Sequence, residues 1–452
     1  MKNPLKIGNA QAFWGDRNTA AAALVQQQQD LDILTMDYLA EVSMSILAVQ
    51  KQKDPNAGYT KDFLDVVKSL APQWQSGRKL TLITNAGGLN PEGCGVACQK
   101  LLTKLRCSPL KIAVITGDDV AHELKHSSPS DFQNIDTGKG IEAVQKDIAT
   151  ANVYIGSKSI VEALQQGADI IITGRVADPC LTAAPCISHF NWSWNDYNSI
   201  ASATIAGHLI ECGTQVTGGF STNWQSIESM THPGYPVIEV YGDGSMVVTK
   251  PPGTDGNVNI ETVKEQLLYE IGDPDNYLSP DVTASFLSLQ VEEIGKDRVK
   301  IVGAKGKPPP EKLKVSATYQ DGYRIEGMIT LYGRDCREKG RKCGEILLQR
   351  LKALEMEPNE YLVECLGTGD VVPGLQTYDT NETVLRIAAR DHHKDSLQQL
   401  AKEIAPLVTS GPQGITGYSS GRPKVRPVYS YWPTLIDPEK VQPTVTLLEV
   451  KS

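Results

Sequence analysis

Hydrophobic positions in the first half of the chain form short continuous runs, and longer amphipathic stretches separate them. Runs rich in Val, Ile and Leu that lack alternation are typical of strands buried on both faces. Helices between such strands predict a parallel sheet, because parallel connections need helical crossovers. The predicted strands cover residues 5–8, 31–35, 79–84, 111–116, 154–155 and 170–173, and the predicted helices cover 18–29, 36–52, 159–166 and 200–212.

This pattern predicts an α/β fold with an open, mostly parallel, doubly wound sheet. A closed barrel is the alternative, and the uneven spacing of the strands disfavours it. After about residue 218 the pattern of hydrophobic and polar residues changes. Residues 236–250 alternate between apolar and polar and predict a hairpin that turns at Asp243-Gly244. Further predicted strands cover 299–302, 323–332 and 383–389, further helices cover 260–271, 340–354 and 396–409, and 415–423 has the composition of a lid or interface loop.

This change in the hydrophobic pattern predicts two domains. Residues 1–225 would form the parallel α/β domain, which carries most of the candidate site loops. Residues 226–452 would form an α+β domain that ends in an extended, proline-rich tail over 422–448. A length of 452 residues agrees with two or three domains.

Composition and charge narrow the class of protein. A hydrophobic content of 40% excludes wholesale disorder. The net charge of −9 argues against nucleic acid as a partner. The chain has no apolar run long enough to span a membrane, and its first 13 residues lack the apolar core of a secretory signal. Nine cysteines, an odd number scattered through a long chain, indicate buried thiols in a reducing, cytoplasmic setting.

In open parallel sheets, ligands bind beyond the carboxyl ends of the strands. The first predicted strand leads into a turn with Asn9, Gln11, Asp16 and Arg17, where Arg17 offers a two-bond fork to a carboxylate or phosphate. The alternative is that Asp16 only caps the following helix. The second strand leads to Asp37, a candidate acid/base group or, equally, a helix cap.

The third predicted strand leads into the strongest local signal, the turn from Asn85 to Pro91. Gly87 and Gly88 let backbone amides approach a ligand closely. Asn90 followed by proline predicts a helix start, and a helix N-terminus offers free N–H groups to an anion. An ordinary strand-to-helix turn is the alternative.

Two further strand ends carry charged pairs. Asp118 and Asp119 offer a weak site for a divalent cation, or they could act as acid/base groups. Adjacent side chains seldom point the same way, so one of the two is expected to cap a helix. Arg175 is a candidate carboxylate clamp beside Asp178. The alternative is an ion pair that holds the loop together.

His208 and Glu211 lie three residues apart and share one face of the predicted helix, with Gln215 just beyond it. A histidine beside a carboxylate is a general acid/base arrangement. One His and one Glu are too few ligands for a zinc site. The alternative is a buried, structural histidine.

Several stretches of the chain resemble the acyclic terpene utilisation family AtuA. They are GNAQAFWGDR, LDILTMDYLAEVSMSILA, ITNAGGLNP, ITGRVADP, GHLIECGTQVTGG, VKEQLLYEIGDPDNYLSPDV and VYSYWPTL, and they span nearly the whole chain. The resemblance implies a place beside the breakdown of branched acyl-CoA compounds such as geranyl-CoA. It also implies a chain without the small ferredoxin-like domain that many members carry at the C-terminus. It supplies no catalytic residue.

These signals favour an enzyme that acts on a small carboxylic acid or its CoA thioester, as a hydratase or lyase. In this hypothesis His208 moves the proton, Glu211 orients it, the amides of Gly87 and Gly88 hold the oxyanion, and an arginine fixes the carboxylate. The CoA thioester is then the substrate rather than a cofactor. The expected partners are the small-molecule substrate and further copies of the chain in a homo-oligomer.

Two alternatives stay open. One is a metal-dependent hydrolase in which Asp37, Asp118 or Asp119 holds a divalent cation such as Mg²⁺. The other is a ligand-binding or assembly subunit without catalysis, which works with an acyl-CoA enzyme and with a separate small ferredoxin-like subunit.

Overall fold

The computed structural model describes residues 2–107, 109–128, 130–419 and 421–451. They form two compact units, of which the second is Tyr319–Ser430 and the first comprises the residues before and after it. The chain leaves the first unit along β14 (Leu313–Tyr332) and returns along β18 (Arg426–Ile436). These boundaries differ from the one expected near residue 225, because strands from both halves of the chain share one sheet.

In the described residues the first unit contains a ten-stranded sheet with the order β11-β12-β8-β7-β1-β2-β3-β6-β4-β19. The five strands from β1 to β4 in this order pair in parallel, and the outer strands pair antiparallel. The α/β class is thus confirmed, with a mixed sheet, while the doubly wound arrangement stays a prediction. The strands are β1 (Leu5–Asn9), β2 (Ile33–Met36), β3 (Thr81–Thr84), β4 (Leu110–Thr116), β6 (Ile170–Thr173), β7 (Val237–Val240), β8 (Met246–Thr249), β11 (Gln290–Gly295), β12 (Arg298–Val302) and β19 (Thr444–Val450).

Helices pack against both faces of this sheet. One face meets α1, α3 and α4, and the other meets α6, α7 and α8. The helices of this unit are α1 (Ala20–Gln27), α2 (Glu41–Lys53), α3 (Phe63–Gln75), α4 (Pro91–Lys104), α5 (Ala121–His126), α6 (Lys158–Gln165), α7 (Cys180–Phe190), α8 (Tyr197–Glu211) and α9 (Ile260–Leu268), with short 3-10 turns at Ile141–Ala143, Gln145–Asp147, Gly213–Gln215, Trp224–Ser226 and Pro438–Lys440.

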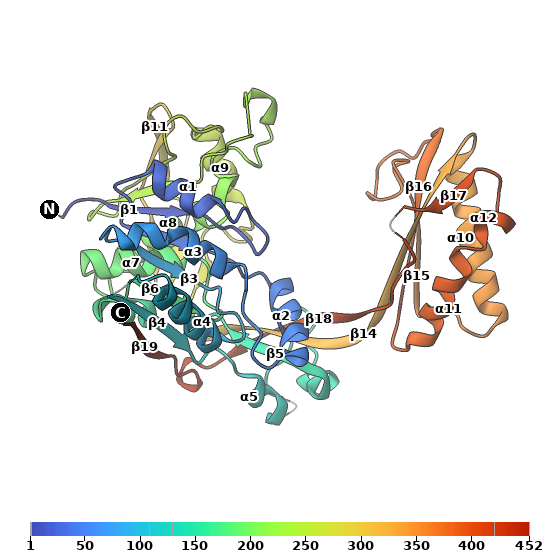
Figure 1. The fold of residues 1–452 in the computed structure, drawn as a ribbon, viewed down its shortest axis with the longest axis horizontal. Helices are drawn as coiled ribbons and strands as arrows, with labels where there is room; N and C mark the ends of the chain where they lie inside the picture. The colour runs from blue at the N-terminus through green and yellow to red at the C-terminus, as the bar shows by residue number, and fades with distance from the viewer. Residues whose placement is uncertain (1, 108, 129, 420, 452) are drawn as a thin grey trace. The chain divides into compact units, whose positions relative to one another are not determined.

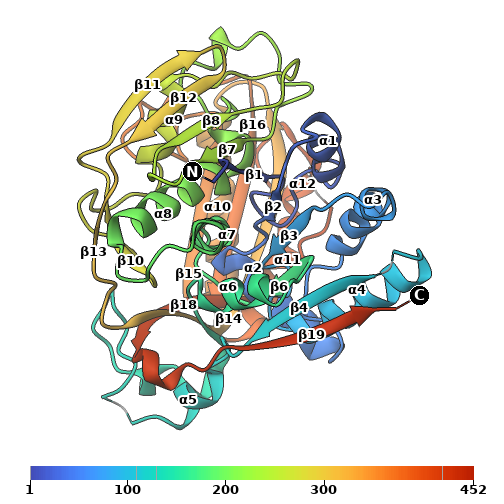
Figure 2. The same cartoon turned by 90° about the vertical axis from the view of Figure 1, so that its left-hand side faces the viewer.

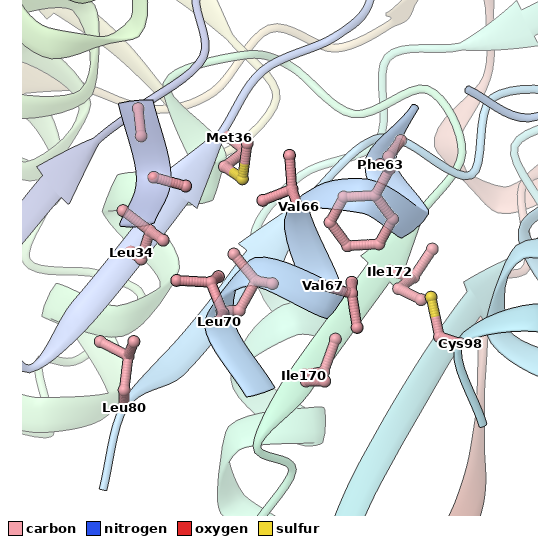
Figure 3. Packing of buried hydrophobic residues seen from close by; sticks show 14 of the residues in the cluster. Leu34, Met36, Phe63, Val66, Val67, Leu70, Leu80, Cys98, Ile170 and Ile172 are labelled. Carbon is pink, nitrogen blue, oxygen red and sulfur yellow. The ribbon is translucent and has the colours of Figure 1, made fainter. Parts of the chain in front are cut away.

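The main core lies under α3. Phe63, Val66, Val67 and Leu70 recur at helical spacing and bury their side chains against alternate residues of the strands, such as Ile170. Figure 3 shows this packing. Complete burial of each such side chain stabilises the fold by about 1.5–3 kcal/mol. The strand alternation sends the intervening residues to the opposite face of the sheet.

Three sequence predictions differ from the structure. The strand predicted at 154–155 is β5 (Ile148–Val153), which pairs with β14 instead of joining the parallel sheet. Helix α3 lies in a stretch for which the sequence predicted no element. The proline-rich end of the chain, which was expected to be an extended tail, forms the strands β18 and β19, and β19 pairs antiparallel with β4 at the sheet edge (Figure 2).

The second unit has its own sheet and core. Its elements follow the βαββαβ order of ferredoxin-like folds, and the antiparallel sheet has the order β15-β16-β14-β17. Both long helices pack on one face of this sheet (Figure 1). Besides β14, the elements are α10 (Cys336–Ala353), β15 (Glu360–Leu366), β16 (Glu382–Asp391), α11 (Lys394–Ile404), α12 (Leu407–Ser410) and β17 (Ile415–Tyr418).

This internal ferredoxin-like unit was not predicted from the sequence. The resemblance concerned a domain appended at the C-terminus, whereas this unit precedes the strands that complete the first sheet. The loop expected at 415–423 begins with the edge strand β17, and its Ser420 lies outside the described residues. A third, small sheet is formed by β9 (Tyr277–Ser279), β10 (Val282–Ser285) and β13 (Lys305–Lys307). None of the described helices is long and apolar enough to cross a lipid bilayer.

Candidate functional site

A cavity of about 620 Å³ lies in the first unit where β1, β2, β6 and α8 end. Ligand sites at the carboxyl ends of parallel strands are typical of α/β proteins. Six carboxyl side chains and two cations line it. They are Asp16, Asp37, Glu41, Asp178, Glu211 and Glu270, with Arg175 and Lys314. Tyr154 and Gln215 also line it, and Phe13, Leu39, Phe220 and Tyr269 supply apolar surface. We call this the acidic cavity.

Asp37 follows β2 directly and is held by its neighbours. Its Oδ1 accepts hydrogen bonds from Asn85 Nδ2 at 2.6 Å and from the Leu39 N–H at 3.0 Å. Burial raises the pKa of Asp37 to about 6, although Arg175 and the bond from Asn85 act in the opposite direction. A carboxyl group with a pKa near neutrality is suited to exchange protons.

Asn85 itself is fully buried and is absent from the lining of the acidic cavity. Its Oδ1 accepts the Tyr38 N–H at 2.7 Å while its Nδ2 donates to Asp37. The residue predicted to touch a ligand therefore connects the end of β3 to the end of β2. In this arrangement Asn85 positions Asp37.

Arg175 is a buried cation that lies among the carboxyl groups of the acidic cavity. Its Nη1 donates to the Leu39 carbonyl at 2.5 Å and lies 3.1 Å from Asp178 Oδ1. The guanidinium stacks over the Tyr154 ring, with 4.1 Å between its carbon and the ring centroid. Tyr154 in turn donates a hydrogen bond to Glu41. The buried guanidinium is thus surrounded by an ion pair, an aromatic face and a carbonyl.

Two more carboxyl groups face the same cation. Burial raises the pKa of Asp178 well above its ordinary value, and Asp37, Glu211 and Glu41 raise it further, while Arg175 acts against the rise. For Glu41, burial also acts to raise the pKa, yet the bond from Tyr154 and the charge of Arg175 hold the pKa below its ordinary value. The carboxyl groups of this cavity therefore differ in pKa. Such a difference allows one group to act as a general acid while a neighbour acts as a general base.

His208 lies behind the wall of the acidic cavity, whereas Glu211 lines it. His208 is only 2% exposed, and the rings of Tyr277 and Phe286 lie 5.7 Å from its own. Its Nδ1 is 3.1 Å from Glu211 Oε1 and its Nε2 is 2.8 Å from the Gln266 carbonyl.

The carbonyl of Gln266 only accepts, so Nε2 of His208 carries a proton. The other oxygen of Glu211, Oε2, is buried without a hydrogen-bond partner among the described residues.

The turn after β1 positions the opposite wall. Asn9 Nδ2 donates to the carbonyls of Ile210 and Glu211, at 2.6 and 2.9 Å, and so holds the end of α8. Gln11 is buried and donates to the Phe13 carbonyl at 2.7 Å. Arg17 is exposed, outside the lining of the cavity, and its Nη1 lies 3.4 Å from the Thr231 carbonyl.

The predicted anion turn after β3 is closely packed. A Cβ on Gly87 would lie 2.5 Å from the Thr173 carbonyl oxygen, and one on Gly88 would lie 2.4 Å from the Leu47 side chain. The Gly88 N–H donates to the Asn85 carbonyl at 3.1 Å. Here the glycines allow backbone and side chains to approach one another, and neither glycine lines the acidic cavity.

Gly88, Asn90, Asp118 and Asp119 line a separate, smaller cavity of about 210 Å³. Asn90 caps α4, and its Oδ1 accepts the Gly93 N–H at 2.9 Å. Asp119 Oδ1 accepts the Ala121 N–H at 3.0 Å, but the residue at the N-cap of α5 is Val120, so Asp119 is not the helix cap that the sequence suggested. The predicted strand-end residues therefore divide between two cavities.

Asp118 is buried and joins two loops. Its Oδ2 accepts the Arg175 N–H at 2.7 Å and Asn152 Nδ2 at 2.8 Å. Burial raises its pKa to about 6. Within the described ranges, no group of three or more His, Cys, Asp and Glu side chains has the arrangement of a metal site.

Sequence reasoning did not select Tyr154 or Lys314. Tyr154 lies just after β5, where the pattern indicated only a strand, and Lys314 comes from β14, far along the chain. The Lys314 ammonium lies 4.8 Å from the centroid of the Tyr154 ring. No local signal marks either residue, because only the pairing of β5 with β14 brings them together.

The fold and the cavity define an α/β protein with a cluster of buried carboxyl groups around one arginine at the strand ends. The chain belongs to the acyclic terpene utilisation family AtuA, whose model matches residues 5–447. No curated protein and no solved structure matches the chain.

Proposed function

We propose that this chain is an enzyme that adds or removes water on a small acyl compound by acid/base chemistry in the acidic cavity. The observation that carries the proposal is the cluster of Asp37, Asp178 and Glu211 around Arg175, in which burial separates the pKa values of neighbouring carboxyl groups. Membership of a family described by acyclic terpene utilisation favours a branched acyl chain as the substrate class.

The charge of the cavity favours a neutral reacting group. Six carboxyl groups against two cations would repel a phosphate or a free carboxylate. A thioester has no charge at its carbonyl, so the acyl part of a CoA thioester would enter while the phosphates stay outside. This differs from the carboxylate clamp that the sequence suggested for Arg175.

In the proposed elimination, Asp37 removes a proton from the carbon beside the thioester carbonyl. Asp178, whose raised pKa favours the protonated form, donates a proton to the leaving hydroxyl group. A C–H and a C–O bond break, a C=C bond forms, and water leaves. Arg175 stabilises the negative charge that develops on the carbonyl oxygen. Hydration is the reverse.

Glu211 contacts the substrate in this proposal, and His208 is a positioning residue. The hydrogen bond to Nδ1 fixes Oε1 of Glu211, whose side chain lines the cavity. The role of proton carrier thus moves from His208 to the carboxyl groups, because His208 is outside the cavity lining.

The test measures the thermal stability of the purified chain with a panel of ligands. The panel contains saturated, 2-enoyl and 3-hydroxyacyl CoA thioesters, both linear and branched, and the corresponding free acids. A true ligand at a hundredfold excess over Kd raises stability by about 2.7 kcal/mol, which a thermal melt detects. We expect stabilisation by the thioesters and loss of enoyl absorbance on hydration.

An exposed acid on α3, Asp65, gives a matched control. Asp37→Asn should abolish turnover, and Asp65→Asn should retain it. Stabilisation by free acids alone, or full turnover by Asp37→Asn, would contradict the proposal.

A further inference from the structure

The second unit contains an alternating stretch that the proposed function does not use. Along residues 421–426, Pro423 is buried and Val425 packs on the core cluster, while Arg422, Lys424 and Arg426 are exposed. Three exposed cations therefore alternate with two residues that pack inward along this segment.

These cations border a hollow of about 400 Å³ whose residues all belong to the second unit. Its other wall is β14, which contributes Arg324, Glu326 and Met328. We call this the basic hollow, defined by Arg324, Arg422, Lys424 and Arg426 around its wall. Its volume is in the range of small-molecule sites.

The charges of the basic hollow are not neutralised by neighbouring side chains. Its one carboxylate, Glu326, is 3.1 Å from the Nε of Arg386. None of the four cations has an ion-pair partner within the described part of the chain.

Several other arginines of the unit are paired. Arg337 and Arg341 meet Asp370, and Arg390 meets Asp321. The unit has as many Asp and Glu as Lys and Arg residues, so a surplus of positive charge in one hollow is a local arrangement. Like charges held together repel one another, and a bound anion would remove this repulsion.

We propose that the basic hollow binds the phosphate groups of a small molecule that carries at least two adjacent phosphates. Guanidinium groups bind phosphate oxygens through two parallel bonds, and the row of cations matches more than one phosphate. A concave hollow of this volume fits a compact ligand better than a flat polyanionic surface. This site is separate from the acidic cavity and does not depend on the proposed reaction.

The test uses the full chain and titration calorimetry with pyrophosphate, inorganic phosphate and adenosine diphosphate. We expect pyrophosphate to bind more tightly than phosphate, and added salt to weaken it. The double variant Arg422→Gln/Lys424→Gln should bind pyrophosphate at least about tenfold more weakly, because it loses two charge-assisted contacts with the phosphate oxygens. Tighter binding of adenosine diphosphate than of pyrophosphate would add a nucleoside to the ligand.

The matched control is Arg334→Gln/Lys342→Gln, which removes two exposed cations of the same unit outside the hollow. It should keep the affinity of the wild type. No binding of pyrophosphate, or equal losses in both double variants, would overturn the proposal. Binding of a single-stranded oligonucleotide or of phosphatidylserine vesicles that pyrophosphate does not displace would also overturn it, in favour of a macromolecular surface.

Discussion

At the scale of single residues, burial decides what the carboxyl groups of this protein can do. Asp37 and Asp118 both follow strands of the parallel sheet, and burial raises the pKa of each to about 6. Their surroundings differ. Asp37 lines the acidic cavity, whereas Asp118 accepts two hydrogen bonds that hold loops together. The same shift therefore occurs at one residue that lines the cavity and at another that makes a structural contact.

The first prediction concerns the pH dependence of turnover. A general base acts only when ionised, so activity should rise with pH through the pKa of Asp37, at about 6 in the free protein. The measurement is kcat/KM against pH between about 4 and 9. A rate independent of pH across that range would remove Asp37 from the role of base.

The second prediction separates Glu211 from His208. Glu211→Gln should lower kcat strongly, because the variant loses the carboxyl group that faces the cavity. His208→Asn should lower kcat while KM stays near the wild-type value, because it removes the side chain that holds Oε1 of Glu211 in position. The control is Gln215→Ala, at the cavity wall, which should act mainly on KM. An unchanged kcat in His208→Asn would leave His208 with a purely structural role.

The third prediction concerns stability and Asp118. Asp118 has a raised pKa, so it binds its proton more tightly in the folded protein than in the unfolded chain. Its contribution to the free energy of unfolding is therefore favourable below pH 3.8 and is lost as the pH rises to about 6. The difference corresponds to about 3 kcal/mol. Asp118→Asn should remove this part of the pH dependence in urea unfolding, measured at acidic and at neutral pH.

Asp118→Ala gives the contrast for the same residue. It leaves the Arg175 N–H and Asn152 Nδ2 without their acceptor, at a cost of about 1–3 kcal/mol for each group. The alanine variant should therefore be less stable than the asparagine variant at neutral pH. Equal stability of the two would show that these bonds do not hold the loops.

At the scale of elements, the predicted strand-end residues divide between the acidic cavity and the packed interior of the protein. Asn85, Gly87 and Gly88 lie at the end of β3 as predicted, yet they are packed against protein rather than facing the acidic cavity. A strand-to-helix turn has the same local sequence whether it holds a ligand or a neighbouring loop. Only the register of β2, β3 and β6 decides between these outcomes.

The fourth prediction concerns the start of α4. Asn90 accepts the Gly93 N–H, and its Nδ2 donates to the Ala57 carbonyl at 3.0 Å. Asn90→Ala should destabilise the protein by about 1–2 kcal/mol, because a cap and a loop contact are lost together. Asn90→Asp keeps the cap and should lose less. The measurement is the midpoint of urea unfolding, and equal losses in both variants would contradict the capping role.

At the scale of the whole molecule, the ferredoxin-like unit is an insertion with adjoining ends. Ser430 donates to Asp321 Oδ2 at 2.6 Å, so the two ends of the unit meet. Its core is a separate cluster of buried residues on β14, β15, β16 and the helices. A unit with its own core and adjoining termini meets the conditions for independent folding.

The fifth prediction is that residues 319–430 fold when expressed alone. The fragment should unfold cooperatively with heat and retain its near-ultraviolet circular dichroism spectrum. Leu385→Ala, in the middle of the core cluster, should lower its stability by about 2–5 kcal/mol. The exposed substitution Leu362→Ala on β15 is the control and should change little. A fragment without a cooperative transition would show that the unit needs the rest of the chain.

The sequence by itself determined the α/β class, most strands of the large sheet, the hairpin at 236–250 and the helix start at Asn90, because each rests on a local pattern of burial or capping. The tertiary structure decided three other matters. It placed β19 and β7 beside the parallel strands, it inserted the second unit, and it brought Tyr154 and Lys314 to Arg175. These depend on pairings between residues far apart in the chain, and no local periodicity records such pairings.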